Sequence, residues 1–202
     1  MENSRDAIIF SDNYTTSNPL IKKLQGDFFK KLFTLIEKKN LKPESLLELG
    51  AGEGYSTRLL KTFFGPELFY VSSDLRTELV KQNYIKSKCD SQVVFDITKP
   101  SVRYKKTDVV IALEVLEHIP CPELALDQIA LLTKNVAIVS VPFEPWWRLG
   151  NILRGAYLKD LGNTPDHVNH WGKNSFKKFL SNKFANVEVT ISFPWLIGIC
   201  SH

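Results

Sequence analysis

The hydrophobic pattern has a helical period near the start of the chain and a mixed period after it. Between residues 20 and 39, apolar residues recur at helical spacing and paired lysines occupy the other side. Pro43 ends this element. Short β-rich runs then appear at 45–49, 68–73, 92–96, 107–113 and 135–141, and helix-capable segments lie between them at 55–64, 75–87 and 122–133.

This alternation predicts one α/β domain over residues 1–202, in which helices cover both faces of a parallel sheet. An N-terminal helical segment over 1–43 precedes the sheet. The pattern breaks after Val141, where a proline-flanked turn leads into EPWWRLGNILRGAYL and then into a long loop. We therefore expect residues 143–173 to form a cap-like insertion.

The end of the chain returns to regular structure. Asn174 or Ser175 is expected to cap a last helix, SFKKFL. The final segment, NVEVTISFPWLIGICSH, predicts two strands bent at Pro194.

Composition places the chain among single-domain globular proteins. It has 202 residues, of which 44% are apolar and 24% charged. The three cysteines, Cys89, Cys121 and Cys200, have neither metal-ligand nor redox spacing, which indicates free thiols in a reducing compartment. We see no secretory signal and no apolar run of membrane-spanning length, so a cytoplasmic location is expected.

The positive charge gathers in one part of the sequence. Residues 145–183 contain seven basic residues against two acidic ones, a net charge of +5, while the whole chain carries +4. The same segment holds three of the four tryptophans and two of the four histidines. It is either a patch for an anionic or membrane-associated partner or a solvated helix face with a few buried rings.

The sequence LLELGAGEGYS, residues 46–56, carries the strongest candidate chemistry. Its glycines follow a G-x-G-x-G spacing just after the first predicted strand, whereas the dinucleotide fingerprint is G-x-G-x-x-G. Carboxylates mark three strand ends, Glu48 before the glycines, Asp74 and Asp96. They suit a ligand with a ribose, an amino-bearing base and a cationic amino-acid part, and they would repel a pyrophosphate. Alternatively, Asp74 caps the next helix and Asp96 caps a turn.

Together, LLELGAGEGYST, the two aspartates and TDVVIALEVLEHI resemble class I S-adenosylmethionine-dependent methyltransferases. The likeness covers about residues 45–141. It implies a Rossmann-like three-layer sandwich, with a seven-stranded, mostly parallel sheet whose last strand is antiparallel. It also implies S-adenosylmethionine as the cofactor.

The same resemblance assigns cofactor contacts. The methionine part would be lined by Glu48, Gly50, Ala51 and Gly52. Asp74 would bind the ribose hydroxyls, and Asp96 would hold the adenine amino group, with the Ile97 backbone on the ring. Glu114, after the fourth strand, would lie near the methionine and the transferred methyl group.

The segment after the fourth strand bears on the acceptor. It lacks the Asn/Asp-Pro-Pro-Tyr run typical of enzymes that methylate amino groups of DNA bases, and instead has ALEVLEHIP. EVLEHIP is similar to ubiquinone-pathway O-methyltransferases. We therefore expect O-methylation of a small-molecule, lipid-linked or sugar-linked acceptor, and anionic acceptors are among the candidates. Nucleic acid is not the expected partner.

The same residues also allow other functions to be considered. Glu114, Glu117 and His118 also match the E-x-x-E-H of small-RNA 2′-O-methyltransferases, in which these side chains and a distant histidine hold a divalent metal; we assign no metal here. A NAD-binding oxidoreductase is disfavoured by the glycine spacing and the carboxylates. A binding module without turnover is disfavoured by the intact glycine turn.

Three histidines, His118, His167 and His170, are candidate catalytic bases because histidine titrates near neutral pH. Two of them lie in TPDHVNHW, in a loop expected to overhang the strand ends. The cap helix over 145–157 either docks on the domain or contacts anionic lipid as an interfacial helix. Quinone-pathway relatives carry a membrane-contacting insertion in this region, which favours peripheral membrane contact.

Overall fold

The computed structural model of the protein describes residues 18–87, 89–100, 105–153, 155 and 160–202. They form a seven-stranded sheet of order β3-β2-β1-β4-β5-β7-β6. The strands are β1 (Ser45–Leu49), β2 (Phe69–Asp74), β3 (Ser91–Val94), β4 (Thr107–Leu113), β5 (Thr133–Pro142), β6 (Asn186–Ser192) and β7 (Trp195–Ser201). The first five pair in parallel and β7 is antiparallel to both its neighbours, which confirms the predicted sheet.

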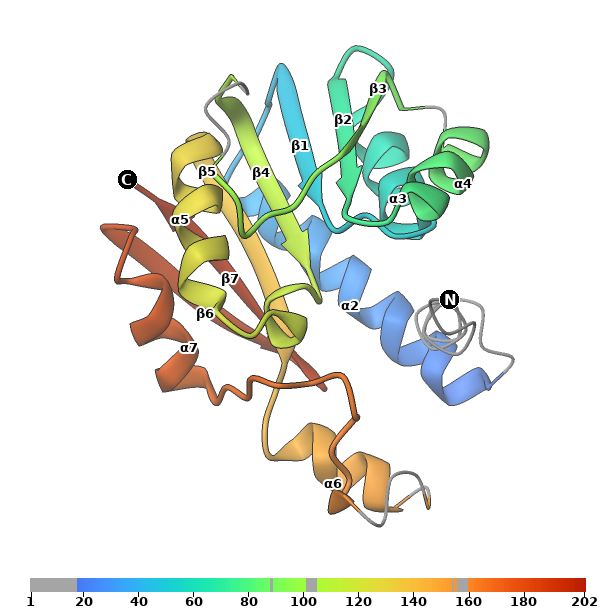
Figure 1. Cartoon of the computed structure of the whole chain (residues 1–202), viewed down its shortest axis with the longest axis vertical. Coiled ribbons are helices and arrows are strands. Elements are labelled where there is room, and N and C mark those ends of the chain that lie inside the picture. Colours follow the sequence, from blue (N-terminus) through green and yellow to red (C-terminus); the bar gives the residue numbers. More distant parts are fainter. Residues whose placement is uncertain (1–17, 88, 101–104, 154, 156–159) are drawn as a thin grey trace.

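Helices cover both faces of this sheet and complete three layers (Figure 1). One face carries helices packed through Phe28, Leu32 and Leu60, and the other carries helices packed through Leu126 and Leu180. The helices are α2 (Pro19–Lys38), α3 (Tyr55–Phe64), α4 (Thr77–Ser87), α5 (Pro122–Leu132), α6 (Trp146–Leu153) and α7 (Lys173–Leu180), with a 3₁₀ turn, η1 (Leu116–His118).

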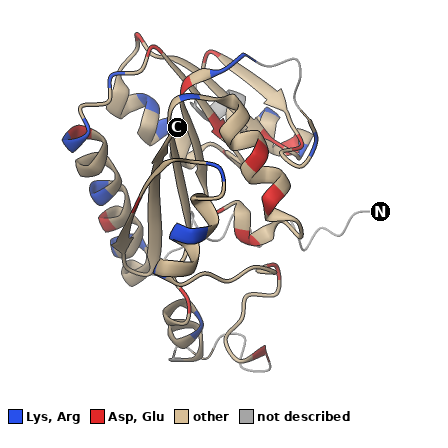
Figure 2. Ribbon diagram, turned by 90° about the vertical axis from the view of Figure 1, so that its left-hand side faces the viewer, with Lys and Arg blue, Asp and Glu red and all other residues tan. Residues whose placement is uncertain are grey.

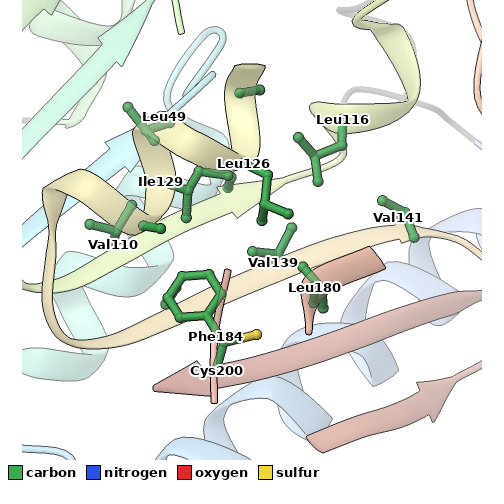
Figure 3. Packing of buried hydrophobic residues seen from close by; sticks show 14 of the residues in the cluster. Leu49, Val110, Leu116, Leu126, Ile129, Val139, Val141, Leu180, Phe184 and Cys200 are labelled. Carbon is green, nitrogen blue, oxygen red and sulfur yellow. The ribbon is translucent and has the colours of Figure 1, made fainter. Parts of the chain in front are cut away.

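The central strands are buried on both faces, which explains why they appear in the sequence as continuous apolar runs. Along β4, Val110 packs in the cluster under α5 and α7, and Ile111 packs in the cluster under α2 and α3. Figure 3 shows the first cluster, in which Leu126, Ile129 and Val139 contribute side chains from α5 and β5. Because the central strands are packed on both faces, the sheet supports the residues at the carboxyl ends of its strands.

Helix α7 begins earlier than the sequence predicted. Its N-cap is Gly172, so the expected cap at Asn174 or Ser175 is wrong. Ser175 lies at the third helical position instead, where its hydroxyl accepts a 3.0 Å hydrogen bond from the Gly172 amide. A side chain at the third helical position can accept a hydrogen bond from a free amide at the helix start. Ser175 therefore caps the helix from within its first turn.

The cap-like segment leaves the sheet at the carboxyl end of β5 and returns to it before α7 (Figure 1). A bridge between Phe143 and Trp171 closes its base. The segment is therefore an appendage at the carboxyl ends of the strands, where the predicted site also lies.

Across the described ranges, no helix is long and apolar enough to cross a membrane.

Candidate functional site

The carboxyl ends of β1, β2, β3 and β4 meet at one edge because these strands run parallel. The connections turn in opposite directions between β1 and β4, and an open sheet binds ligands at such a point. The turn 50–54 and Glu114 follow these two central strands. Asp74 and Asp96 lie at the ends of β2 and just beyond β3.

The glycine turn has the backbone that its sequence requires. Gly50, Gly52 and Gly54 have φ angles of 69°, 53° and 83°, in the region that side chains disfavour. A Cβ atom on Gly50 would lie 2.4 Å from a methyl group of Val115. A Cβ atom on Gly52 would meet no described atom within 4 Å, so a ligand can approach the backbone there.

Asp74 is joined to this turn. Its Oδ2 accepts a 3.0 Å hydrogen bond from the Gly52 amide, and its Oδ1 accepts one of 3.0 Å from the Arg76 amide. The Arg76 side chain also lies 3.7 Å from Oδ1. Asp74 thus shapes the start of α4 and faces the glycine turn, where the ribose contact is expected.

Asp96 is held in a short turn of its own. Its Oδ1 accepts hydrogen bonds from the Thr98 amide at 3.0 Å and the Thr98 hydroxyl at 2.6 Å, and Lys99 lies 3.2 Å from Oδ2. The Thr98 hydroxyl lowers the pKa of the Asp96 carboxyl. The carboxylate therefore caps its turn, and Ile97 lies within that turn. Their expected adenine contacts remain predictions.

Glu48 lies beneath the glycine turn. Its side chain is buried and accepts hydrogen bonds from the hydroxyls of Ser56, Thr57 and Tyr70, the last at 2.8 Å. Burial raises the pKa of this carboxyl, and the three hydroxyl donors oppose the rise. The network fastens α3 and β2 to β1. Contact of Glu48 with the cofactor remains a prediction, and Tyr70 is a partner that the sequence analysis missed.

After β4 the backbone makes an irregular turn. Glu114 has a φ of 55°, uncommon outside glycine, and its amide donates to the Ser140 carbonyl at 3.1 Å. Glu117 follows on η1 and is 1% exposed. Within the described part of the chain, neither oxygen of its carboxyl group has a hydrogen-bond partner. Burial, reinforced by Glu114, raises its pKa well above the usual range.

Two of the predicted histidines, His118 and His167, lie beside Glu117. Its carboxylate and the rings of His118 and His167 offer ligand atoms that all lie within 4.8 Å of one another, a grouping that could hold a metal ion. His167 packs between His118 and Trp147, at ring distances of 4.9 and 5.9 Å. Burial lowers the pKa of His167 to about 3, so its ring is neutral near pH 7. The expectation that no metal binds is untested.

The hydrogen bond of His118 determines its tautomer. Its Nδ1 lies 3.0 Å from the Asp166 carbonyl oxygen, which can only accept, so we assign the proton to Nδ1. Nε2 therefore keeps a lone pair, the form that accepts a proton or binds a metal. Burial lowers the pKa of His118, which also favours the neutral ring.

His170 lies apart from this group. Its ring is exposed, and its Nε2 is 2.6 Å from Oδ1 of Asn163. The structure thus brings His118 and His167 together and leaves His170 outside the cluster. Its catalytic role remains a prediction.

Asn169 was missed by the sequence analysis. Its side-chain amide donates to the carbonyls of Leu116 and Ile119, on both sides of Glu117 and His118. An asparagine in a polar loop has no distinctive spacing, so its sequence carries no signal for this contact.

Comparison with known proteins gives a family match and one curated relative. The model of a family described as a methyltransferase domain matches residues 21–187. Malonyl-[acyl-carrier protein] O-methyltransferase from Neorickettsia risticii (strain Illinois) is 27% identical over 139 residues, which cover 66% of this chain and 54% of the relative. The chain thus spans about half the length of that relative.

Solved structures share the fold across nearly the whole chain. The plantazolicin methyltransferase BpumL in complex with SAH has a TM-score of 0.72 and 14% identity, covering 98% of this chain and 90% of that one. Magnesium protoporphyrin IX methyltransferase from Synechocystis PCC 6803 with bound SAH has a TM-score of 0.70 and 16% identity, covering 98% and 94%. At these identities the likeness establishes the architecture of the sheet and its helices.

Proposed function

The chain belongs to the methyltransferase domain family, and from this premise we propose that it is a class I S-adenosylmethionine-dependent methyltransferase that methylates an oxygen atom of a small-molecule acceptor. The cofactor supplies a methyl group on a sulfonium. The enzyme's main task is then to hold the acceptor oxygen in line with that methyl group.

The strand edge offers groups that fit this cofactor. The open backbone at Gly52 provides room for the methionine part, and the acidic Asp74 beside it can accept hydrogen bonds from ribose hydroxyls. We assign the cofactor contacts, as expected from the sequence, to Gly50, Ala51, Gly52, Asp74, Asp96, Ile97 and Glu114. The buried Glu48, which the sequence also placed at the methionine part, is assigned the role of holding the glycine turn in position.

The observation that carries the proposal is the orientation of His118. Its Nδ1–H points to the Asp166 carbonyl, which orients a half-buried ring just beyond β4 in the tautomer whose Nε2 carries no proton. A positioned imidazole can take the proton of a reacting hydroxyl, and an acceptor carboxylate would need no base. His167 packs against this ring, and His170 is assigned to the outer wall of the acceptor site.

The test begins with calorimetric titration of purified, chelator-treated protein with S-adenosylmethionine, S-adenosylhomocysteine and NAD. We expect the first two to bind and NAD not to bind. A labelled-methyl screen of hydroxyl and carboxylate acceptors, free, lipid-linked or sugar-linked, then identifies the substrate. With a hydroxyl acceptor, His118→Ala should lose transfer but keep cofactor binding, whereas His202→Ala at the far end of the sheet should keep both. Binding of NAD alone, or full activity of His118→Ala on a hydroxyl acceptor, would overturn the proposal.

A second candidate is a divalent-metal RNA 2′-O-methyltransferase. It is favoured by the buried Glu117 carboxylate, which faces His118 and His167 with no partner among the described residues. A carboxylate ligand suits Mn²⁺ or Mg²⁺. This candidate requires activity on RNA that a chelator abolishes and Mn²⁺ restores, whereas the first candidate keeps its activity in the chelator.

We also propose peripheral membrane contact through the cap. The polar side of α6 faces the returning loop of the cap: Asn151 is buried and donates to the Gly162 carbonyl at 2.8 Å, and Arg148 donates to the carbonyls of Asp160 and Leu161. These bonds tie the helix to the returning loop. The polar residues Arg148 and Asn151 of α6 therefore point toward this loop.

The apolar side of α6 faces outward. Trp146, Leu149 and Ile152 repeat every three residues and are 46%, 43% and 39% exposed. Arg148 is the charged residue of this helix, which is mostly uncharged in Figure 2. A helix with this orientation suits the interface of an anionic bilayer, given the net charge of +5 over residues 145–183. Residues 154, 156 and 157 of the expected contact segment lie outside the described residues.

A further inference from the structure

The turn that carries Glu117 and His118 is too short to fix its own shape. Two backbone hydrogen bonds lie within it, from His118 to Val115 at 3.2 Å and from Ile119 to Leu116 at 3.3 Å. A single 3₁₀ turn has weaker hydrogen-bond geometry than an α-helix. Its conformation must therefore be supported by the chain around it.

That support comes from the returning segment of the cap. The amides of Val168 and Asn169 donate to the Glu117 carbonyl at 2.9 and 3.2 Å. The carbonyl of Asp166 binds Nδ1 of His118. Residues 166–169 thus lie alongside the turn and contact both its backbone and its histidine.

The Asn169 side chain spans the turn. Its Nδ2 donates to the Leu116 carbonyl at 3.2 Å and to the Ile119 carbonyl at 2.6 Å. Both partners are acceptors, which assigns the NH₂ group to this side. One nitrogen with two protons thereby links the residues that flank Glu117 and His118.

We infer that Asn169 is a positioning residue for methyl transfer: its amide clamps η1 so that the His118 ring keeps its position and its Nδ1–H on the Asp166 carbonyl. The inference rests on the proposed function of His118. An aspartate has nearly the same shape but no proton to donate, and its charge would face two carbonyl oxygens. Asn169→Asp therefore removes the clamp with little change in volume.

The experiment compares Asn169→Asp with Asn182→Asp, the same change at an exposed residue after α7. The chain has four histidines, so their ring nitrogens can be resolved by NMR of histidine-labelled protein. Wild type and Asn182→Asp should show His118 with its proton on Nδ1. Asn169→Asp should bind S-adenosylhomocysteine within about threefold of wild type and lose the Nδ1–H signature. With a hydroxyl acceptor from the labelled-methyl screen, it should lose at least tenfold in kcat, with KM for S-adenosylmethionine nearly unchanged.

Two further measurements keep the inference testable if Asn169→Asp does not fold. Asn169→Ser keeps one donor and should give an intermediate kcat. In the wild type, the side-chain amide protons of Asn169 should exchange more slowly than those of Asn182. An unchanged His118 signature in a folded Asn169→Asp, or fast exchange at Asn169, overturns the inference. If Asn169→Asp loses the signature but the wild type transfers no methyl group to any acceptor, the proposed function is wrong and the inference about the position of His118 stands.

Discussion

The backbone amide of Gly52 donates a 3.0 Å hydrogen bond to Oδ2 of Asp74, which ties the glycine turn after β1 to the end of β2. The other oxygen of the same carboxylate binds the Arg76 amide at the start of α4. Asp74 therefore shapes the floor of the candidate cofactor site through bonds within the chain. Its geometric and ligand-binding roles can be separated by substitution.

Asp74→Ala should weaken S-adenosylhomocysteine binding by about 2 kcal/mol, or roughly thirtyfold, because hydrogen bonds to a charged group contribute about 1.5–3 kcal/mol. Asp74→Asn keeps an oxygen for the Gly52 amide and should lose less. Calorimetric titration measures both. Asp27→Ala, at an exposed position of α2, is the control. Unchanged affinity in Asp74→Ala would show that the ribose lies elsewhere.

Gly50→Ala should destabilise the protein by about 2–4 kcal/mol. The backbone φ of 69° disfavours a side chain, and the new Cβ would lie 2.4 Å from a methyl group of Val115. Urea unfolding measures the change in free energy. Adding Val115→Ala should recover the part due to the clash. Gly26→Ala, in α2 with no described atom within 4 Å of its Cβ, should instead stabilise the protein slightly. Equal effects at the two glycines would refute this account.

Local sequence signals were enough to predict the sheet and to place the candidate site at the carboxyl ends of its strands. Parallel strands buried on both faces must be continuously apolar, so β1 and β4 were recognisable, and the glycines and Asp74 marked the ends at which the chain turns. These signals are short-range. Each one depends on a few neighbouring residues and the conformations that they allow.

The orientation of Glu48 could not be derived in the same way. Its carboxylate is bound by Ser56 and Thr57 of α3 and by Tyr70 of β2, which lie 8, 9 and 22 residues away. Asn169 likewise acts on residues about 50 positions earlier. Such contacts depend on the packing of separate elements, and a single sequence does not report that packing.

Asp108 should make stability depend on acid pH. At the amino end of β4 its carboxylate accepts hydrogen bonds from Lys134 and from the amides of Glu44 and Ser45. The Lys134 ammonium leads the interactions that lower its pKa in the folded protein. The stabilisation is therefore complete above the unfolded pKa, near 3.9, and is lost as pH falls through the folded value.

Urea unfolding between pH 6 and pH 3 measures this dependence. The free energy of unfolding of Asp108→Asn should be lower than that of wild type at pH 6 and should fall less steeply as acid is added. The difference between the two proteins should shrink toward the acid end of the range. Parallel curves would show that Asp108 does not contribute to the acid sensitivity.

Leu149→Ser should weaken binding to anionic lipid vesicles, because it removes the middle residue of the outward apolar stripe of α6. Leu131→Ser is the matched control, since Leu131 is 48% exposed on α5, away from the cap. Sedimentation with phosphatidylserine-containing vesicles should give several-fold less bound Leu149→Ser than wild type or Leu131→Ser. Both variants should keep S-adenosylhomocysteine affinity, because neither leucine is part of the candidate cofactor site at the carboxyl ends of the strands. Equal sedimentation of all three proteins would mean that α6 does not face a bilayer, and the exposed stripe would then need a protein or acceptor partner.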